Sequence, residues 1–486
     1  MGFVKERLER LRASNGMAMA IVYATLMLDN MLLTAVVPVL PEYFFRQHLA
    51  EAPSNMSSLR HDPNATETPP IPSTTSSTAN VTIEPDGDCD MNQELAFLSD
   101  ENLYIGILFA SKPIVQIVAN AAVGPISDYI GFDVPMFTGY VIMCFSAVLF
   151  AFGKNYSMLL VARAIQGIGS ACASTAGMGM LADRYSDEEK RGRALGIALG
   201  GLAMGILIGP VFGSVVYELA GKEWVFLVLA IMALFLAVTQ LSIYRLNVER
   251  RQPGEEGTSL ATLLRDPYIV ICACAIMLGN MCIGVLETGQ PIWMMINMCA
   301  PKWALGVAFL PESVSYMVMT YVVALLCQSY PRWLICVIGL YFITAGCVGL
   351  PFATKLPELI VPGLVIGSAV GLVDTSMFPV MATLVDQRHK PVYGSVYAIA
   401  DVAFCVAFIV GPLCAGLVVS TIGFEWLMWI VAMVTFLFTP LVFFLRKPTS
   451  QSEEKIPILY HAKNSDFENG DNVFHEAKNG SMVHSD

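Results

Sequence analysis

Six charged side chains interrupt stretches of sequence that are otherwise apolar enough to lie in a membrane. They are four acids and two bases: Asp29, Lys112, Arg163, Glu287, Asp374 and Asp401. Inserting one such group into a bilayer costs roughly 2.5–3.5 kcal/mol, so the set costs on the order of 15–20 kcal/mol. If each base neutralises one acid, two carboxylates remain, and these can bind either a proton or a protonated amine. The set favours a proton-coupled carrier of organic cations, the alternative being ion pairs that only hold helices together.

Depth along the apolar stretches suggests how these charges divide. Asp29 lies near the midpoint of the first stretch and Lys112 near the midpoint of the second, while Asp401 lies about 15 Å into the eleventh. Lys112 and Asp401 can therefore share a level, and we predict that they form an ion pair. Asp29, Glu287 and Asp374 remain as amine or proton sites. Asp374 has few polar neighbours in the sequence, so we assign the proton to it.

Aromatic side chains accompany these charges. Each aromatic face attracts a cation by roughly 0.5–2 kcal/mol and can also stack on an aromatic substrate. Ordinary core packing is the alternative role for any single one. The aromatic residues that we expect at the substrate site are Trp293, Phe309, Tyr316, Tyr397 and Phe404.

The composition requires a membrane protein. The 486 residues are 55% hydrophobic and 14% charged, with a mean hydropathy of +0.60, whereas a soluble chain of this length needs a more charged surface. The net charge of −12 comes from acids in an early loop and the C-terminal tail, and no basic footprint for a nucleic acid is present. Apolar stretches of spanning length predict twelve transmembrane helices. We place them at 17–43, 102–124, 134–153, 156–181, 194–217, 223–246, 268–294, 303–327, 333–352, 357–386, 391–421 and 424–445.

The distribution of basic residues predicts the orientation. Segments on one side hold 20 of the 28 Lys and Arg residues, which marks that side and both termini as cytoplasmic. A charged loop in the middle separates six helices from six. The predicted organisation is a cytoplasmic N-terminus (1–16), a six-helix half (17–244) with a long luminal loop (44–101), a cytoplasmic linker (245–267), a second half (268–445) and a cytoplasmic tail (446–486).

The long luminal loop is rich in Pro, Ser and Thr and carries three glycosylation sequons, at Asn55, Asn64 and Asn80. We expect it to be disordered and glycosylated. Of the twelve cysteines, ten fall in predicted helices as small buried residues. The other two, Cys89 and Cys299, fall in luminal loops, and an oxidising lumen favours a disulfide between them.

The two halves show a weak internal repeat. The fifth predicted helix has Gly209-Pro210 followed by Gly213, and its counterpart, the eleventh, has Gly411-Pro412 followed by Gly416. Gly and Pro in corresponding helices of two halves are typical of transporters, where bent helices pack closely and rock against each other.

Six motifs resemble those of a known transporter family. They lie at 28–32, 108–112, 163–169, 196–205, 291–295 and 392–405. On these motifs the chain resembles the vesicular amine transporters of the major facilitator superfamily over nearly the whole membrane portion. It is more similar to the monoamine branch than to the acetylcholine branch.

The resemblance implies a fold and a site. It implies the major facilitator fold, with the amine contacted by Asp29, Asn30 and Glu287 and with Asn280 and Tyr316 nearby.

The resemblance also implies roles for the remaining charges. It pairs Lys112 with Asp401, assigns a coupling proton to Asp374 and makes Arg163 the arginine of the fourth-helix motif. It joins Cys89 to Cys299 as well.

Three features depart from the family pattern. Thr288 stands after Glu287 where proline is usual, Phe408 stands where monoamine members often have tyrosine, and the loop 124–133 lacks the usual basic residues.

The activity that the resemblance implies is antiport, with two protons leaving for each amine that enters. The substrates would be monoamines of the dopamine, serotonin, noradrenaline or octopamine and histamine class, loaded into synaptic or secretory vesicles. No cofactor, metal or ATP site is expected, because a proton gradient drives the exchange and no phosphate-binding loop is present. The alternatives are an acetylcholine transporter, a plasma-membrane cation exporter and a non-transporting sensor; no cluster of catalytic residues suggests an enzyme.

The tail contains an acidic dileucine-type sorting signal. Glu454 precedes Ile458 and Leu459, and such a signal is expected to bind sorting adaptors that direct the protein to vesicles.

Overall fold

A computed structural model of the protein describes residues 14–37, 39, 91–243, 258–298, 300, 302–326, 330–419 and 422–447, with backbone alone at 91–105 and a few helix-end positions. Several predictions concern residues outside this set and stay predictions. These are the three sequons Asn55, Asn64 and Asn80, the disulfide between Cys89 and Cys299, and the sorting signal at Glu454, Ile458 and Leu459.

The described part of the chain contains twelve long helices, as the sequence predicted. They are α2 (Asn15–Thr34), α4 (Met91–Ile130), α5 (Asp133–Phe152), α6 (Tyr156–Arg184), α7 (Glu188–Ala220), α8 (Lys222–Ile243), α10 (Pro267–Met298), α12 (Leu310–Leu326), α13 (Arg332–Gly349), α14 (Ile360–Arg388), α15 (Tyr393–Val419) and α16 (Phe424–Phe438). Short pieces join them: α9 (Leu260–Leu263), α11 (Lys302–Val307) and the 3-10 turns η2 (Leu350–Phe352), η3 (Leu356–Leu359) and η4 (Thr439–Arg446).

Several boundaries differ from those predicted, among them those of α4, which runs from Met91 to Ile130 where 102–124 was predicted. Two of the differences have a clear local reason. The predicted helix 194–217 begins earlier, at Glu188, because Asp187 caps it by accepting a hydrogen bond from the Lys190 N–H at 3.1 Å. The charged residues of this first turn had lowered the local hydropathy. The predicted helix 303–327 is divided into α11 and α12, and Pro311 lies in the first turn of α12.

Among the described residues, 11 helices are long and apolar enough to cross a membrane by themselves. The twelfth long helix, α6, is not among them although it has 29 residues. It carries Arg163, Gln166 and several Ser and Gly residues, and most of its side chains are buried. A helix that faces protein instead of lipid can carry this polarity because its neighbours satisfy the polar groups.

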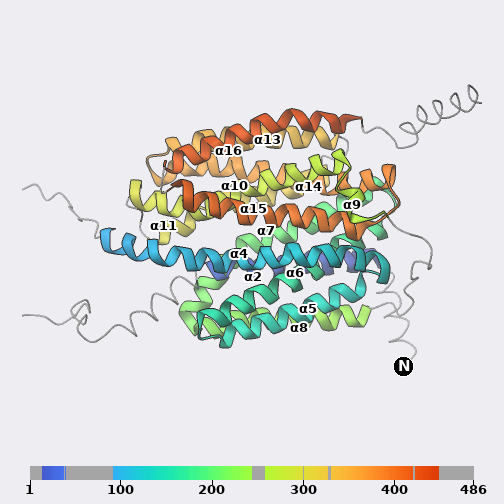
Figure 1. The fold of residues 1–486 in the computed structure, drawn as a ribbon, viewed down its shortest axis with the longest axis horizontal. Coiled ribbons are helices and arrows are strands. Elements are labelled where there is room, and N and C mark those ends of the chain that lie inside the picture. Colours follow the sequence, from blue (N-terminus) through green and yellow to red (C-terminus); the bar gives the residue numbers. More distant parts are fainter. Residues whose placement is uncertain are drawn as a thin grey trace, which may run out of the picture.

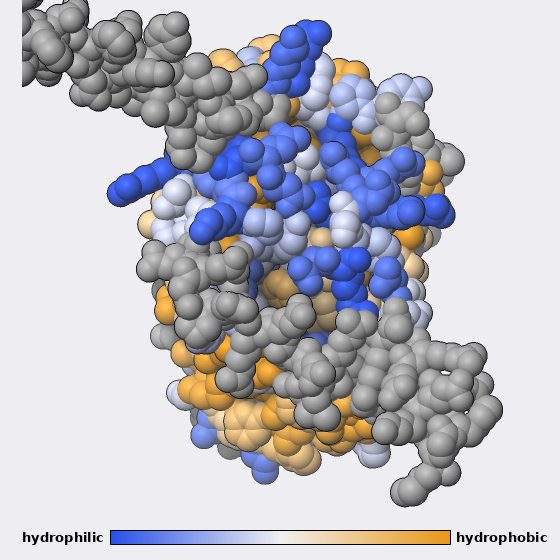
Figure 2. Space-filling model, turned by 90° about the vertical axis from the view of Figure 1, so that its right-hand side faces the viewer, coloured by the Kyte–Doolittle hydropathy of each residue, from blue (hydrophilic) through white to orange (hydrophobic). Residues whose placement is uncertain are grey.

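The helices form a bundle whose outer sides are apolar. In Figure 1, α5 and α8 lie along one side, α13 and α16 lie along the opposite side, and the remaining long helices lie between them. Large side chains on the outer helices are strongly exposed, including Ile231 and Phe235 of α8 and Phe436 and Leu437 of α16. Water would disfavour such a surface, whereas lipid does not. Figure 2, which views the end of the bundle that carries α9, shows hydrophilic side chains gathered there instead.

Glycines bring the site-bearing helices into backbone contact. Gly201, Gly205, Gly209 and Gly213 recur every four residues on the face of α7 that packs against α2. A Cβ atom at Gly205 would lie 2.5 Å from the carbonyl oxygen of Met27, so only glycine allows this approach. The stripe holds the segment of α2 that carries Asp29 and Asn30 against α7.

The second half repeats this contact, as the internal repeat had suggested. A Cβ atom at Gly411 of α15 would lie 3.0 Å from the backbone of Gly284 in α10. The fifth long helix thus packs on the first, and the eleventh packs on the seventh. This contact lies one turn before Glu287.

Polar contacts join the two halves at the end of the bundle that carries α9, which we call the α9 end. Asp128 of α4 accepts hydrogen bonds from the backbone N–H groups of Gly394 (2.7 Å) and Ser395 (2.8 Å) at the start of α15. Arg191 of α7 forms an ion pair with Asp386 of α14 at 2.6 Å. The bundle is therefore closed at the α9 end.

A buried ion pair at the α9 end braces the second half. Asp266, just before α10, accepts hydrogen bonds from Arg388 Nε at 2.7 Å and His389 Nε2 at 2.8 Å. Burial raises the pKa of Asp266, but the hydrogen bonds from Arg388, His389 and the Tyr268 N–H outweigh burial and lower the pKa below its usual value. The stabilisation is therefore present above about pH 4, the usual range of a free aspartate, and is lost as the pH falls through the folded pKa.

We predict that Asp266→Asn destabilises the protein by about 3–5 kcal/mol at pH 7, because it breaks the buried ion pair with Arg388 by removing one partner. Thermal unfolding of the purified protein in detergent measures this. The exposed acid Glu189 provides a control, since Glu189→Gln should leave the unfolding temperature unchanged. Equal unfolding temperatures for Asp266→Asn and Glu189→Gln would show that the buried pair does not brace the fold.

Candidate functional site

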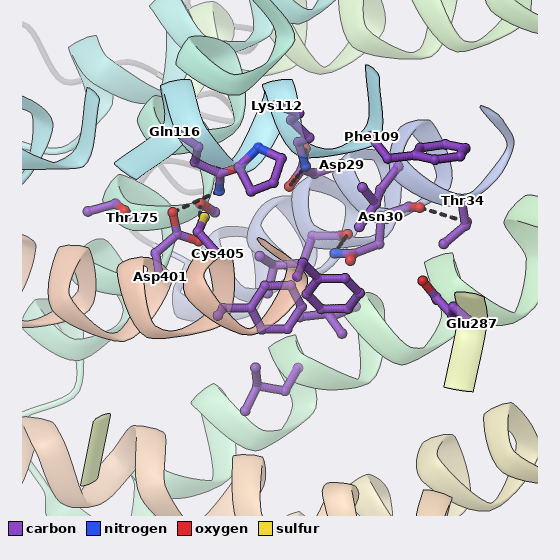
Figure 3. Close-up of a pocket in the computed structure, with 18 of the residues that line it drawn as sticks. Asp29, Asn30, Thr34, Phe109, Lys112, Gln116, Thr175, Glu287, Asp401 and Cys405 are labelled. Atoms are coloured by element: carbon purple, nitrogen blue, oxygen red, sulfur yellow. Dashed lines mark hydrogen bonds and ion pairs between the residues drawn. The ribbon is translucent and has the colours of Figure 1, made fainter. Parts of the chain in front are cut away.

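The candidate site is a cavity of about 130 Å³ that both halves of the chain line. Five of the six charges expected in the membrane interior line it, and Asp374 does not. The lining charges are Asp29, Lys112, Arg163, Glu287 and Asp401. Figure 3 shows Asp401 and Glu287 at opposite sides of the cavity, with Asp29 and Lys112 between them.

The ammonium group of Lys112 pairs with Asp29. Lys112 Nζ lies 3.2 Å from Asp29 Oδ1 and 3.4 Å from Oδ2, and both side chains are almost fully buried. Ser170 Oγ also donates a hydrogen bond to Asp29 Oδ1. The predicted pairing of Lys112 with Asp401 is therefore wrong in this conformation. The negative charge of Asp29 in the cavity is therefore neutralised by Lys112.

Asp401 is held by neutral donors instead of a lysine. Gln116 Nε2 donates to its Oδ2 at 2.8 Å, Asn120 Nδ2 donates to the same oxygen, and Ser174 Oγ donates to Oδ1 at 3.3 Å. Gln116 and Asn120 follow Lys112 on α4 at intervals of four residues, so the three form one polar stripe. Amides at this spacing in an apolar helix were a sequence signal that the prediction missed.

Arg163 bonds to the end of α2 and not to an acid. Its Nη1 donates to the Leu32 carbonyl and its Nη2 to the Leu33 carbonyl, each at 3.2 Å, and Nη1 also donates to Gln166 Oε1 at 2.8 Å. The last carbonyls of a helix carry partial negative charge, which suits a cation. Neutralisation of Arg163 thus consumes no carboxylate, and among the described residues three acids of the original set, instead of two, have no basic partner.

Glu287 is the carboxylate most open to a ligand. It lines the cavity, it is only partly buried, and it has no hydrogen bond or ion pair to the described residues. Thr288, which replaces the usual proline, donates its hydroxyl hydrogen to the Gly284 carbonyl at 3.0 Å. The helix therefore continues past Glu287 with its hydrogen bonding intact.

Asp374 lies away from the cavity in a polar pocket of its own. It is buried, with hydrogen bonds from Asn280 Nδ2 and Tyr316 Oη, each at 3.0 Å. The expectation that Asp374 has few polar neighbours is wrong, because two donors distant in sequence reach it. Asn280 and Tyr316, which were expected near the amine, thus point at Asp374 instead.

The predicted substrate residues therefore divide into two groups. Those that line the cavity are Asp29, Asn30, Glu287, Tyr397 and Phe404, and those that do not are Asn280, Trp293, Phe309 and Tyr316. The indole of Trp293 donates to Glu425 at 2.8 Å and packs against Phe424, which explains its orientation. Three further aromatic rings line the cavity and were not predicted, namely Phe109, Phe378 and Phe408.

A family model for the major facilitator superfamily matches residues 19–400 and again 303–458. The synaptic vesicular amine transporter of Rattus norvegicus is 46% identical over 476 residues, covering 92% of this chain and 91% of that protein. The chain belongs to the vesicular amine transporter family of the major facilitator superfamily. Its resemblance to that family and its twelve-helix fold, both expected from the sequence, are thereby confirmed.

Other members of the family and one solved structure are similar as well. The human chromaffin granule amine transporter is 43% identical, covering 92% of this chain and 90% of its own. The human vesicular acetylcholine transporter is 37% identical, covering 90% and 84%. The human organic anion transporter TETRAN superposes with a TM-score of 0.68 at 16% identity, over 88% of this chain and 99% of that chain, which shows a shared fold. This vesicular amine transporter homologue is thus a transporter and not an enzyme.

Proposed function

We propose that this family member loads protonated monoamines from the cytosol into acidic secretory or synaptic vesicles, with two protons leaving for each amine that enters. The observation that carries the proposal is Glu287, an unpaired carboxylate that faces a cavity lined by both halves. The substrates are of the dopamine, serotonin, noradrenaline or octopamine and histamine class. The greater identity to the amine transporters than to the acetylcholine transporter favours them.

The cavity has the chemistry that a small aromatic amine needs. The ammonium group binds at Glu287, with Asn30 of α2 supplying a polar neighbour. The rings of Phe404 and Phe408 lie tilted against each other at a centroid distance of 4.8 Å and line the same cavity, where they offer an apolar wall to an aromatic substrate. Phe408 in place of tyrosine makes this wall less polar.

Proton binding falls to the carboxylates that neutral donors hold. Asp401 accepts from two amides and a serine hydroxyl, and Asp374 accepts from an amide and a tyrosine hydroxyl. No lysine or arginine pairs with either carboxylate in the described part of the chain. Such a group gains or loses a proton more readily than a paired one, and Asp401 does so beside the cavity.

The exchange is energetically sufficient for loading. A gradient of roughly 1.5 pH units supplies about 4 kcal/mol for two protons. The net positive charge that moves outward adds about 1 kcal/mol at some 50 mV. Together they support roughly 10⁴-fold accumulation.

Orientation follows from the basic residues, with the α9 end facing the cytosol and the loop 44–101 facing the lumen. The structure is then in a conformation closed toward the cytosol. The polar contacts of Asp128 and Arg191 between the halves must break for the cavity to open there. Binding of sorting adaptors to the tail would direct the protein to vesicles, with both termini cytoplasmic.

The proposal is tested by uptake of labelled serotonin, dopamine, octopamine, histamine and acetylcholine into membrane vesicles with an acidified interior. We expect the monoamines to accumulate and a protonophore to abolish their accumulation. Accumulation of acetylcholine alone would support the acetylcholine alternative, and uptake that persists without a gradient would contradict proton coupling.

A further inference from the structure

A buried glutamate that the sequence-based set of charges omitted lies near Glu287. Glu312 belongs to the first turn of α12 and is only 6% exposed. Its Oε1 is buried without a hydrogen-bond partner. Burying an ionised carboxylate without a hydrogen-bond partner costs free energy, unless the group is protonated or a cation binds it. The buried position of Glu312 therefore suggests that it binds a proton or a cation.

Among the described residues, one acid and two thiols lie in the surroundings of Glu312, and no Lys, Arg or His bonds to it. Glu287 lies on α10, and α10 and α12 meet at Asp374, whose carboxylate accepts from Asn280 of α10 and Tyr316 of α12, each at 3.0 Å. Glu287 lies two turns after Asn280 and Glu312 one turn before Tyr316, so both acids lie toward the same end of the bundle.

On α10, the sulfur of Cys282 lies 3.3 Å from that of Cys347 in α13. On the α14 side, Gly363 and Gly367 face the backbone of Glu312 and contribute no charge.

The close approach of α14 fixes the position of Glu312. A Cβ atom at Gly367 would collide with the Glu312 carbonyl oxygen, so this glycine lets the two backbones touch. The position also lies at the N-terminus of α12, where the helix dipole favours a negative charge. The site can thus support either protonation state of Glu312.

The two bases of the membrane interior are occupied elsewhere. Lys112 pairs with Asp29, and Arg163 bonds to carbonyls of α2. Neither Glu287 nor Glu312 has an ion pair with the described residues. Two nearby carboxylates in a protein interior cannot both be ionised without a cation, so they hold at least one proton between them when the cavity is empty.

We propose that Glu312 is the proton-binding partner of Glu287, and that a protonated amine bound at Glu287 displaces the proton that Glu312 holds. The O–H bond of the carboxyl group breaks, its proton leaves to water, and the amine keeps its own proton and its positive charge. The ammonium group then offsets the charge of the newly ionised pair. This inference rests on the proposed function and deepens it, because it assigns one of the two coupled protons to Glu312 and leaves the other to the carboxylates that neutral donors hold.

The pH dependence of amine binding tests the inference. Each proton released on binding steepens the plot of log Kd against pH by one unit, which is a tenfold change in Kd per pH unit. We would measure the binding of radiolabelled serotonin to the purified full-length protein in detergent between pH 5.5 and 8. Glu312→Gln should lower the slope by up to about one unit relative to the wild type, while Glu312→Asp should retain it.

Ser315→Ala is the matched control, because Ser315 is buried one turn further along α12 and carries no charge. Its slope should equal that of the wild type. A Glu312→Gln slope equal to the wild type would overturn the inference even if the affinity changes. Failure of the wild type to bind serotonin would instead refute the proposed function, so the two failures are distinguishable.

Infrared difference spectroscopy decides the case if Glu312→Gln does not fold. Adding serotonin to the wild type should remove a carbonyl band of a protonated carboxyl group, and the band should shift in Glu312→Asp. No loss of such a band, or a band that is the same in Glu312→Asp, would overturn the inference.

Discussion

Lys112→Ala is expected to reduce amine uptake by at least about a hundredfold. The substitution leaves the Asp29 carboxylate buried without its counter-ion, and breaking a buried pair in this way costs about 3–5 kcal/mol. At about 1.4 kcal/mol for each factor of ten, this cost corresponds to a loss of two to three and a half decades, roughly 10²- to 4 × 10³-fold, in the population of the competent state. Uptake into acidified vesicles, corrected for the amount of protein at the membrane, measures the loss.

Two double variants identify the partner of Lys112. If the pair with Asp29 at 3.2 Å is the one that stabilises the protein, Lys112→Ala with Asp29→Asn should regain most of the lost thermal stability. Lys112→Ala with Asp401→Asn should not regain it. If only Lys112→Ala with Asp401→Asn regained thermal stability, the result would support the Lys112–Asp401 ion pair that was predicted from helix depth. Ser111→Ala, beside Lys112 on α4, serves as the control, because the Ser111 hydroxyl donates to the Leu108 carbonyl of its own helix at 2.7 Å and the substitution keeps both charges of the Lys112–Asp29 pair.

Glu287→Gln is expected to raise the Kd of a monoamine by about a hundredfold or more, with or without a proton gradient. Removing one partner of a desolvated charge pair, here Glu287 with the ammonium group of the amine, costs about 2–5 kcal/mol. No basic side chain of the described residues pairs with Glu287. Asp374→Asn should behave differently, since Asp374 does not line the cavity. It should abolish gradient-driven accumulation while changing the equilibrium Kd by less than about threefold.

The two variants are compared in the same preparation by equilibrium binding and by proton-driven uptake. Thr288→Ala is the control, because Thr288 lines the cavity beside Glu287 and its hydroxyl bonds only to its own helix. An Asp374→Asn protein that loses binding as severely as Glu287→Gln would contradict this division of roles. In that case the Asn280–Asp374–Tyr316 cluster would matter to the shape of the cavity as well.

The sequence alone predicted the membrane class, the twelve helices and the family. These properties depend on hydropathy and on contiguous motifs, which are local features of the chain. They can be predicted without knowing which way each helix is rotated in the bundle. It also predicted that charges meet in the interior, because the cost of burying Asp29, Lys112, Glu287 and Asp401 demands a polar cavity.

Only the tertiary structure decided which of those charges are partners. Depth along a helix gives the level of a side chain, but the direction in which it points depends on how each helix is rotated against its neighbours. Lys112 and Asp401 could share a level, yet Lys112 reaches α2, while Gln116 and Asn120 on the following turns of α4 reach Asp401.

The same reason explains the buried acids that sequence reasoning misjudged. Asp374 has few polar neighbours along its own helix, and its donors Asn280 and Tyr316 come from two other helices. Glu312 follows Pro311 inside the predicted helix 303–327, yet the sequence-based set of interior charges omitted it. The approach of α14 through Gly367 packs it inside the protein. Packing between helices, which no local pattern encodes, thus set the environment of each acid and the chemistry open to it.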